Sequence, residues 1–256
     1  MNKLQEVFSN GKAFIPFITA GDPTMEVTEQ LVLEMAKAGA DLIELGIPFS
    51  DPIAEGPVIQ EADIRALSAG ATTDKIFAMM QRIREASTVP IAFMTYVNPI
   101  FTYGAERFMK NCQEVGVSAI IVPDLPFEEK EELRPYCSQY GVTLISMIAS
   151  TSNDRVRMIA SEAEGFIYCV SSMGVTGVRK EIGNEVAEMI KIVKEVKDIP
   201  CAIGFGISTP EQAEKMAQFS DGVIVGSAIV RIVAQYGEDC VPHVADYVRE
   251  MKKAIS

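Results

Sequence analysis

The stretch AFIPFITA, residues 13–20, is apolar at almost every position rather than at every second one. Runs of this kind are typical of strands that are buried on both faces, as in a parallel sheet covered by helices. Seven similar runs follow, and the sequence therefore predicts eight buried strands. The further runs are DLIELGI (41–47), PIAFMTY (90–96), SAIIVPD (118–124), VTLISMIA (142–149), GFIYCVS (165–171), PCAIGFGI (200–207) and GVIVGSA (222–228).

The longer segments between these runs carry apolar residues at helical spacing, for example Val27, Leu31 and Met35. Several end in a glycine just before the next strand (KAGAD, EVGVS, QYGV), which fits a helix C-cap. Eight such units in 256 residues predict an α/β protein with one domain over residues 1–256. The expected fold is a (β/α)8 TIM barrel with extra helices before the first strand, between the second and third strands, and at the C-terminus. A doubly wound open sheet is the alternative that the pattern leaves open.

Charge and composition limit the partners. The formal net charge is −12 and the isoelectric point is near 4.7, whereas a nucleic-acid partner would require a basic face. We therefore expect no nucleic acid, and any bound phosphate must be small and held locally. No apolar run is long enough to span a membrane, so no membrane contact is expected. The five cysteines are scattered and odd in number, which favours free thiols in a reducing cytoplasm over disulfides or a zinc site.

Three carboxylates lie in ELGIPFSDPIAEGP, residues 44–57. Glu44 is near the C-terminal end of the second apolar run, where barrel enzymes place their chemistry. Burial among apolar neighbours would raise its pKa toward a value useful for proton transfer; the alternative is an internal ion pair, for which the flanking run offers no cation. Glu55 could reach the same barrel mouth or could be a solvated loop acid. Asp51, between Ser50 and Pro52, favours an Asx-turn or a helix start over direct chemistry.

Three glycine-rich elements follow the last three strands: SSMGVTGV (171–178), GFGIST (204–209) and VGSAIV (225–230). Backbone N–H groups in such loops, with the N-terminus of a helix beginning near Ser227, can bind a phosphate without Lys or Arg. Loops after the seventh and eighth strands are where many barrels bind one. The alternative is tight-turn geometry alone. Arg179 and Lys180, beside the first loop, could add positive charge or could be solvated.

Other kinds of chemistry find little support in the sequence. The single histidine, His243, falls in a C-terminal helical segment and is interpreted as a surface residue. A P-loop, clustered metal ligands and a nucleophile elbow are all missing from the sequence. Catalysis would therefore depend on carboxylates, and a tyrosine such as Tyr168 or Tyr96 is a further candidate.

Seven stretches together resemble the family of tryptophan synthase α subunits, in the family's order and over almost the whole chain. The ELG-PFSDP pattern is highly specific to that family, whereas the late glycine loops are shared by many phosphate-binding barrels. The resemblance implies a barrel that cleaves indole-3-glycerol phosphate to indole and glyceraldehyde 3-phosphate by a retro-aldol reaction, without metal or organic cofactor. The stretches are PFITAGDP (16–23), ELGIPFSDPIAEGP (44–57), TYVNPIFTYG (95–104), VPDLPFEE (122–129), YCVSSMGVTG (168–177), GFGIS (204–208) and DGVIVGSAIV (221–230).

The resemblance also implies roles for single residues. Glu44 matches the family's acid–base carboxylate, and Glu55 occupies the position of a second carboxylate that accepts the indole N–H. The apolar walls for the indole match Phe17 and Phe205, and Tyr168 also lines the site. Thr176 is implied to lie on a mobile loop that closes over the substrate. The phosphate cradle matches Gly177, Gly206, Gly226 and Ser227.

One departure from the commoner family pattern is Glu55, where aspartate is usual. The extra methylene moves the carboxylate by about an ångström, which can matter to a rate. Two interpretations stay open: an active lyase, or a binding and regulatory subunit with little catalysis of its own. Another phosphate-binding barrel enzyme is a more remote third, because such enzymes share only the late glycine loops. The resemblance further implies a β subunit, in an α2β2 heterotetramer, that docks on the loops carrying Asp51, Pro52 and Asn98 and receives the indole.

Overall fold

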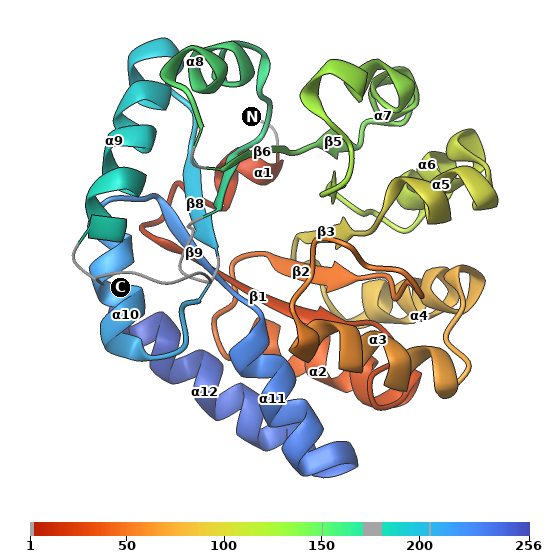
Figure 1. Cartoon of the computed structure of the whole chain (residues 1–256). Coiled ribbons are helices and arrows are strands. Elements are labelled where there is room, and N and C mark those ends of the chain that lie inside the picture. The colour runs from red at the N-terminus through yellow and green to blue at the C-terminus, as the bar shows by residue number, and fades with distance from the viewer. Residues whose placement is uncertain (1–2, 150, 171–180, 205) are drawn as a thin grey trace.

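The computed structural model describes residues 3–149, 151–170, 181–204 and 206–256. Its strands form one parallel sheet (Figure 1). The order in the sheet is β5-β4-β3-β2-β1-β9-β8-β7-β6. The strands are β1 (Ala13–Thr19), β2 (Ile43–Gly46), β3 (Ile91–Met94), β4 (Ala119–Ile121), β5 (Thr143–Leu144), β6 (Ser146–Ala149), β7 (Ile167–Val170), β8 (Cys201–Gly204) and β9 (Gly222–Val225).

The two strands at the ends of that order are neighbours in the sequence. β5 pairs with β4 and β6 pairs with β7, while only Ile145 separates β5 from β6. The Ile145 N–H donates to the Ile120 carbonyl at 2.9 Å. The predicted strand at 142–149 is therefore one extended run in two short pieces, and it closes the sheet. The predicted TIM-barrel fold is confirmed, and the doubly wound alternative is wrong.

Helices surround the barrel and include the predicted extra ones: α1 before β1, α3 between β2 and β3, and α12 at the C-terminal end (Figure 1). In the described residues no helix has both the length and the apolar character needed to cross a membrane. The helices are α1 (Lys3–Glu6), α2 (Met25–Lys37), α3 (Pro57–Ser68), α4 (Thr73–Ala86), α5 (Val97–Tyr103), α6 (Ala105–Glu114), η1 (Phe127–Glu132), α7 (Arg134–Tyr140), α8 (Asn153–Glu162), α9 (Glu181–Val196), α10 (Pro210–Ala217), α11 (Ser227–Tyr236), η2 (Gly237–Asp239) and α12 (Cys240–Ile255).

Local signals fix where several helices begin and end. Thr24 and Thr209 each accept a hydrogen bond from a backbone N–H of the first turn of α2 and α10, which satisfies a donor that the helix itself cannot. After α2, α6 and α7 the predicted glycines Gly39, Gly116 and Gly141 have φ angles of 105°, 69° and 66°. These left-handed conformations are favourable only for glycine, so the predicted C-caps are confirmed.

Side chains along the strands alternate between two buried layers. Phe14 and Ile43 pack outward against the helices, whereas Ile15 and Leu42 fill the barrel interior. Each fully buried aliphatic or aromatic side chain contributes roughly 1.5–3 kcal/mol relative to exposure. Because successive residues of a strand point to opposite faces, Glu44 shares the inward direction of Leu42. The fold therefore places the carboxyl group of Glu44 in the interior of the barrel.

Candidate active site

Glu44 lies on β2 beside Phe17 of β1 and Ala92 of β3. Its side chain is only 1% exposed, and among the described residues neither carboxylate oxygen has a hydrogen-bond partner. Burial raises the pKa of Glu44 to about 8, because desolvation penalises the charged form. The carboxyl group therefore holds its proton at neutral pH. The alternative of an internal ion pair is wrong within the described part of the chain.

Glu55 lies in the loop between β2 and α3, and its side chain is half-buried. The Ala54 N–H donates to the Tyr96 hydroxyl at 3.0 Å, and the Gln60 side-chain amide donates to the Glu55 carbonyl at 2.8 Å. These bonds hold the loop on both sides of the carboxylate. Burial, then the negative charge of Asp63, and finally that of Glu44 raise the pKa of Glu55 to about 8. Glu55 is therefore not a solvated loop acid.

A cavity of about 1300 Å³ opens at the carboxyl ends of the strands, where chemistry was expected. Glu44 and Glu55 both line it. Every other predicted substrate-binding residue that the structure describes lines it as well: Phe17, Tyr168, Gly206, Gly226 and Ser227. The residues that the sequence assigned to one site thus lie around one cavity.

Two aromatic rings in the cavity wall lie over glycines of a neighbouring strand. A Cβ added at Gly46 would come within 2.7 Å of the Phe17 ring, and one added at Gly204 would collide with Tyr168. In each case the glycine lies two residues beyond the residue that the aromatic one opposes in the sheet register. Each ring therefore leans along the neighbouring strand and leaves an apolar wall beside Glu44. This wall is suited to an aromatic ring of the substrate.

The other side of the cavity carries backbone donors. Ser227 begins α11 directly after β9, and Gly226, its N-cap residue, makes no side-chain capping bond. The first N–H groups of a helix lack partners within it, and together with the helix dipole they attract anions. Gly206, with a φ of 79°, lines the same cavity as Gly226 and Ser227. The arrangement fits a small phosphate group without requiring a lysine or arginine.

Several predicted residues lie outside the described residues. They are Thr176, Gly177 and Phe205 of the predicted substrate site, together with Arg179 and Lys180. Their roles stay predictions.

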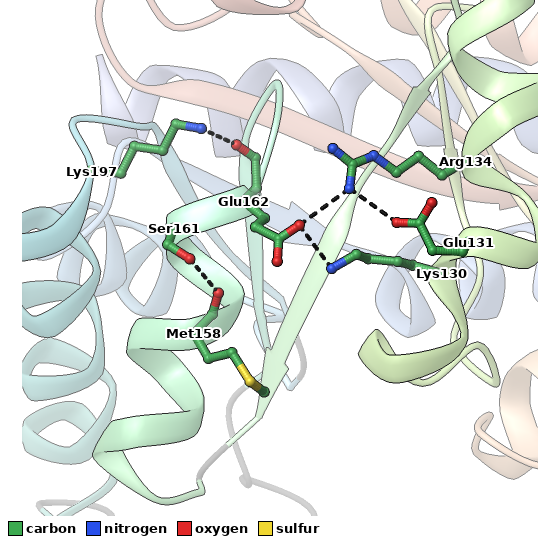
Figure 2. Close-up of polar contacts among 8 residues, drawn as sticks. Lys130, Glu131, Arg134, Met158, Ser161, Glu162 and Lys197 are labelled. Atoms are coloured by element: carbon green, nitrogen blue, oxygen red, sulfur yellow. Dashed lines mark hydrogen bonds and ion pairs between the residues drawn. The ribbon is translucent and has the colours of Figure 1, made fainter.

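The cavity continues sideways between two walls, η1 with α7 on one side and α8 on the other. Figure 2 shows Glu162 of α8 reaching across to Lys130 and Arg134, at 2.9 and 3.2 Å. Arg155 of α8 likewise pairs with Glu128 of η1 at 2.6 Å. The three cations at this side of the cavity are therefore all paired with carboxylates. These ion pairs join the two walls next to the division between β5 and β6.

The residues predicted to face a partner lie outside the cavity lining. Asp51 and Asn98 are exposed, and Pro52 is partly exposed. The Ser50 hydroxyl donates to the Asp51 carboxylate. Next to them Ile53 is 82% exposed and Phe101 is 43% exposed. The loop after β2 and the helix α5 therefore present apolar side chains to solvent beside the barrel mouth.

Sequence reasoning missed one acid. Asp63 of α3 is 4% exposed and lies at helical spacing with the buried residues Ile59, Ala62 and Ala66. That spacing was a signal that could have found it, because a carboxylate on the buried stripe of a helix needs an explanation. Tyr96 does not line the cavity. Its hydroxyl accepts the loop bond described above, and its ring centroid lies 5.4 Å from that of Phe49. The surface position predicted for His243 is confirmed.

Comparison with known proteins identifies close relatives. The sequence model of the tryptophan synthase alpha chain family matches residues 4–256. The chain is 46% identical over 255 residues to the tryptophan synthase alpha chain of Lacticaseibacillus casei, covering 100% of this chain and 96% of the relative. It also resembles the crystal structure of tryptophan synthase subunit alpha from Legionella pneumophila, with a TM-score of 0.90, 35% identity and coverage of 100% and 98%. A chain of the tryptophan synthase complex from Pyrococcus furiosus matches with a TM-score of 0.84, 33% identity and coverage of 94% and 98%.

Proposed function

This chain belongs to the tryptophan synthase alpha chain family, and we propose that Glu44 and Glu55 carry its reaction at the barrel mouth. The chain is an indole-3-glycerol-phosphate lyase, which cleaves its substrate to indole and glyceraldehyde 3-phosphate. The observation that carries the assignment is the Glu44 carboxyl group, buried and unpaired among the described residues on the wall of the cavity.

Glu44 acts as acid and then as base. Its proton goes to the indole ring carbon that bears the glycerol chain, which makes that carbon tetrahedral and weakens the bond to the chain. As the carbon–carbon bond breaks, its electron pair returns to the indole ring, and the neighbouring hydroxyl group loses its proton to Glu44 and becomes the aldehyde. A carboxyl group whose pKa burial raises to about 8 can serve both steps near neutral pH.

Glu55 acts on the indole nitrogen. Protonation of the ring leaves a positive charge on that nitrogen, and a neighbouring positive charge favours the ionised form of Glu55 against the effect of burial. The carboxylate then accepts the N–H and stabilises the charge more in the transition state than in the bound substrate. Phe17 and Tyr168 enclose the ring, while Gly206, Gly226 and Ser227 hold the phosphate. Substrate thus lies between the early strands, which carry the acids, and the late strands, which carry the backbone donors.

The release of indole from indole-3-glycerol phosphate tests the role of Glu55. Glu55→Ala should lower kcat by about 10²–10³-fold, as removal of one charge-stabilising group typically does. Glu55→Asp, which restores the commoner side chain, should keep or raise activity. An alanine variant that turns over like the parent would refute the role of Glu55 and favour a subunit in which this acid serves binding or regulation.

We further propose that the exposed loop after β2, with α5, docks on a β subunit in an α2β2 assembly. Ile53 and Phe101 supply exposed apolar area there, and the bond from Ala54 to Tyr96 links the loop to the start of α5. An exposed turn stiffened by proline loses little entropy on docking. The solved Pyrococcus furiosus complex of the same family supports a partner of this kind.

Asp51→Ala tests this surface. The variant should leave the basal indole release of the isolated chain nearly intact, because Asp51 lies outside the cavity lining, and should reduce the stimulation by β subunit. Indole release with and without β subunit, for parent and variant, gives the ratio. An unchanged ratio would return Asp51 to the interpretation of a solvated loop acid.

We also propose a cytoplasmic location. All five cysteines are free and buried, and thiols persist in a reducing compartment.

A further inference from the structure

Two hydrogen bonds hold the main chain of the loop on both sides of the Glu55 Cα atom. Before it, the Ala54 N–H donates to the Tyr96 hydroxyl at 3.0 Å. After it, the side-chain amide of Gln60 donates to the Glu55 carbonyl at 2.8 Å. Because the main chain decides which positions a side chain can reach, these two bonds also set where the Glu55 carboxylate lies.

The two bonds differ in how easily water can replace them. Gln60 is exposed, so water can take over its bond at little cost. Tyr96 is 1% exposed, and breaking a bond to a buried hydroxyl group leaves that group poorly satisfied, which costs more than breaking an exposed bond. The bond from Ala54 to Tyr96 is therefore the stronger of the two.

Tyr96 is itself fixed by its surroundings. It is the N-cap residue of α5 and follows the end of β3. The next residue, Val97, donates its N–H to the Asp124 carboxylate of the loop after β4 at 3.0 Å. The Tyr96 ring centroid lies 5.4 Å from that of Phe49, at the start of the loop that carries Glu55. A side chain held by packing and by neighbouring hydrogen bonds gives precise support to a reacting group.

We propose that Tyr96 is a positioning residue for Glu55: its hydroxyl group fixes the main chain at Ala54 so that the Glu55 carboxylate meets the indole nitrogen. The inference rests on the proposed role of Glu55. Tyr96 does not line the cavity, so it acts through the loop and not on the substrate. A displacement of about an ångström in a group that stabilises charge is enough to lower a rate.

Tyr96→Phe tests the proposal, because it removes the hydroxyl group and keeps the ring beside Phe49. In steady-state indole release by the full chain, kcat should fall about three- to tenfold, the effect expected for one hydrogen bond. KM for indole-3-glycerol phosphate should change little, because the apolar wall and the backbone donors lie on other segments. Calorimetric binding of glycerol phosphate at the parent affinity shows that the variant is folded. A parental kcat, or a loss confined to KM, would refute the proposal.

Tyr103→Phe is the matched control, since it removes a hydroxyl group from the same helix. The Tyr103 hydroxyl bonds to Asp74 of α4 and Asn111 of α6, away from the loop after β2. Its kcat should equal that of the parent. A loss as large as that of Tyr96→Phe would show that disturbing α5 anywhere lowers the rate, which would also refute a specific role of Tyr96.

A double-mutant cycle tests whether Tyr96 acts through Glu55. Once Glu55 is replaced by alanine, the Tyr96 hydroxyl has no carboxylate to position, so Tyr96→Phe should not lower kcat further. The double variant should therefore match Glu55→Ala, the non-additive result expected for coupled residues. Losses that multiply in the double variant would refute the coupling. A Glu55→Ala variant with parental turnover would instead refute the catalytic role of Glu55, on which the inference rests.

Discussion

Glu44 and Glu162 line the same cavity, but their surroundings shift their pKa values in opposite directions. Glu44 is 1% exposed and has no partner among the described residues, and burial raises its pKa to about 8. Glu162 is 45% exposed and pairs with Lys130 and Arg134, and its hydrogen bond to Lys130 lowers its pKa. Glu44 at the barrel mouth therefore keeps its proton, whereas Glu162 at the side of the cavity keeps its negative charge.

This difference in surroundings separates an acid suited to proton transfer from one that stabilises the fold. An unpaired buried acid destabilises the fold, and such groups gather where proton transfer is needed. A paired, half-exposed acid joins two helices and titrates outside the range in which it could exchange protons near neutral pH. Two glutamates with the same cavity and the same chemistry therefore differ in function because of what their neighbours supply.

The largest effect is expected for Glu44→Gln, which tests whether the buried, unpaired carboxyl group is the proton donor. The amide cannot donate a carboxyl proton, so indole release should fall by at least ~10²–10⁴-fold. Calorimetric binding of glycerol phosphate, which does not use the proton, should remain near the parent value and serve as the control for folding. Near-normal turnover would mean that a buried unpaired acid at this mouth is not the catalyst.

The same variant should change stability with a definite sign. The folded chain holds the Glu44 proton up to a pKa of about 8, against an ordinary value of 4.5. Between these values the unfolded chain binds fewer protons, so stability falls as the pH rises. Glu44→Gln removes this dependence and should gain stability relative to the parent, by a few kcal/mol, between pH 5 and pH 8. Urea unfolding at several pH values checks it, and a pH-independent difference would contradict the burial of a protonated acid.

A third test asks which end of the cavity holds phosphate. If backbone N–H groups hold it, Gly206→Val, at a φ of 79°, should weaken glycerol phosphate binding by about tenfold or more, whereas Arg155→Ala should change it little. Gly237→Val is the matched control, because that glycine also has a positive φ of 54° but lies outside the cavity lining. Calorimetric titration with the reverse order would assign the phosphate to the paired cations of η1, α7 and α8.

The smallest effect is expected for Glu162→Gln. Indole release should be unchanged, and the melting temperature at pH 7 should fall slightly, because the ion pairs to Lys130 and Arg134 are lost. A lowered pKa contributes stability above the ordinary pKa that is lost as the pH falls through the folded value. The difference between variant and parent should therefore shrink toward low pH in a thermal scan. A large loss of turnover would show that this side of the cavity takes part in the reaction.

Much of this arrangement could be predicted from sequence because it depends on local pattern. Apolar runs predicted the strands, and the place of Glu44 within one of them predicted its burial. The division of the run 142–149 at Ile145 was not predictable in this way, because the apolar pattern continues through Leu144 and Ile145 and the break arises from pairing with different neighbours.

Contacts between distant segments were equally hidden. The ion pair between Glu162 and Lys130 joins α8 to η1. These two elements come close together only because the barrel closes. Asp63 was within reach of sequence reasoning, since it follows the spacing of a buried helix face, but the hydrogen bond that it accepts from the Phe49 N–H depends on how the loop after β2 folds back. Propensity and periodicity describe single elements, whereas these contacts each join two.

The two aromatic rings that lie over glycines have a consequence for how this sequence can change by inheritance. Any side chain at Gly204 would meet Tyr168, and any at Gly46 would meet Phe17, and overpacking of this kind typically costs about 1–3 kcal/mol. A mutation at either glycine alone therefore carries this cost, whereas the same mutation after a change to a smaller residue at the aromatic position avoids the clash. The order in which the two positions of each pair change therefore decides how much stability is lost on the way.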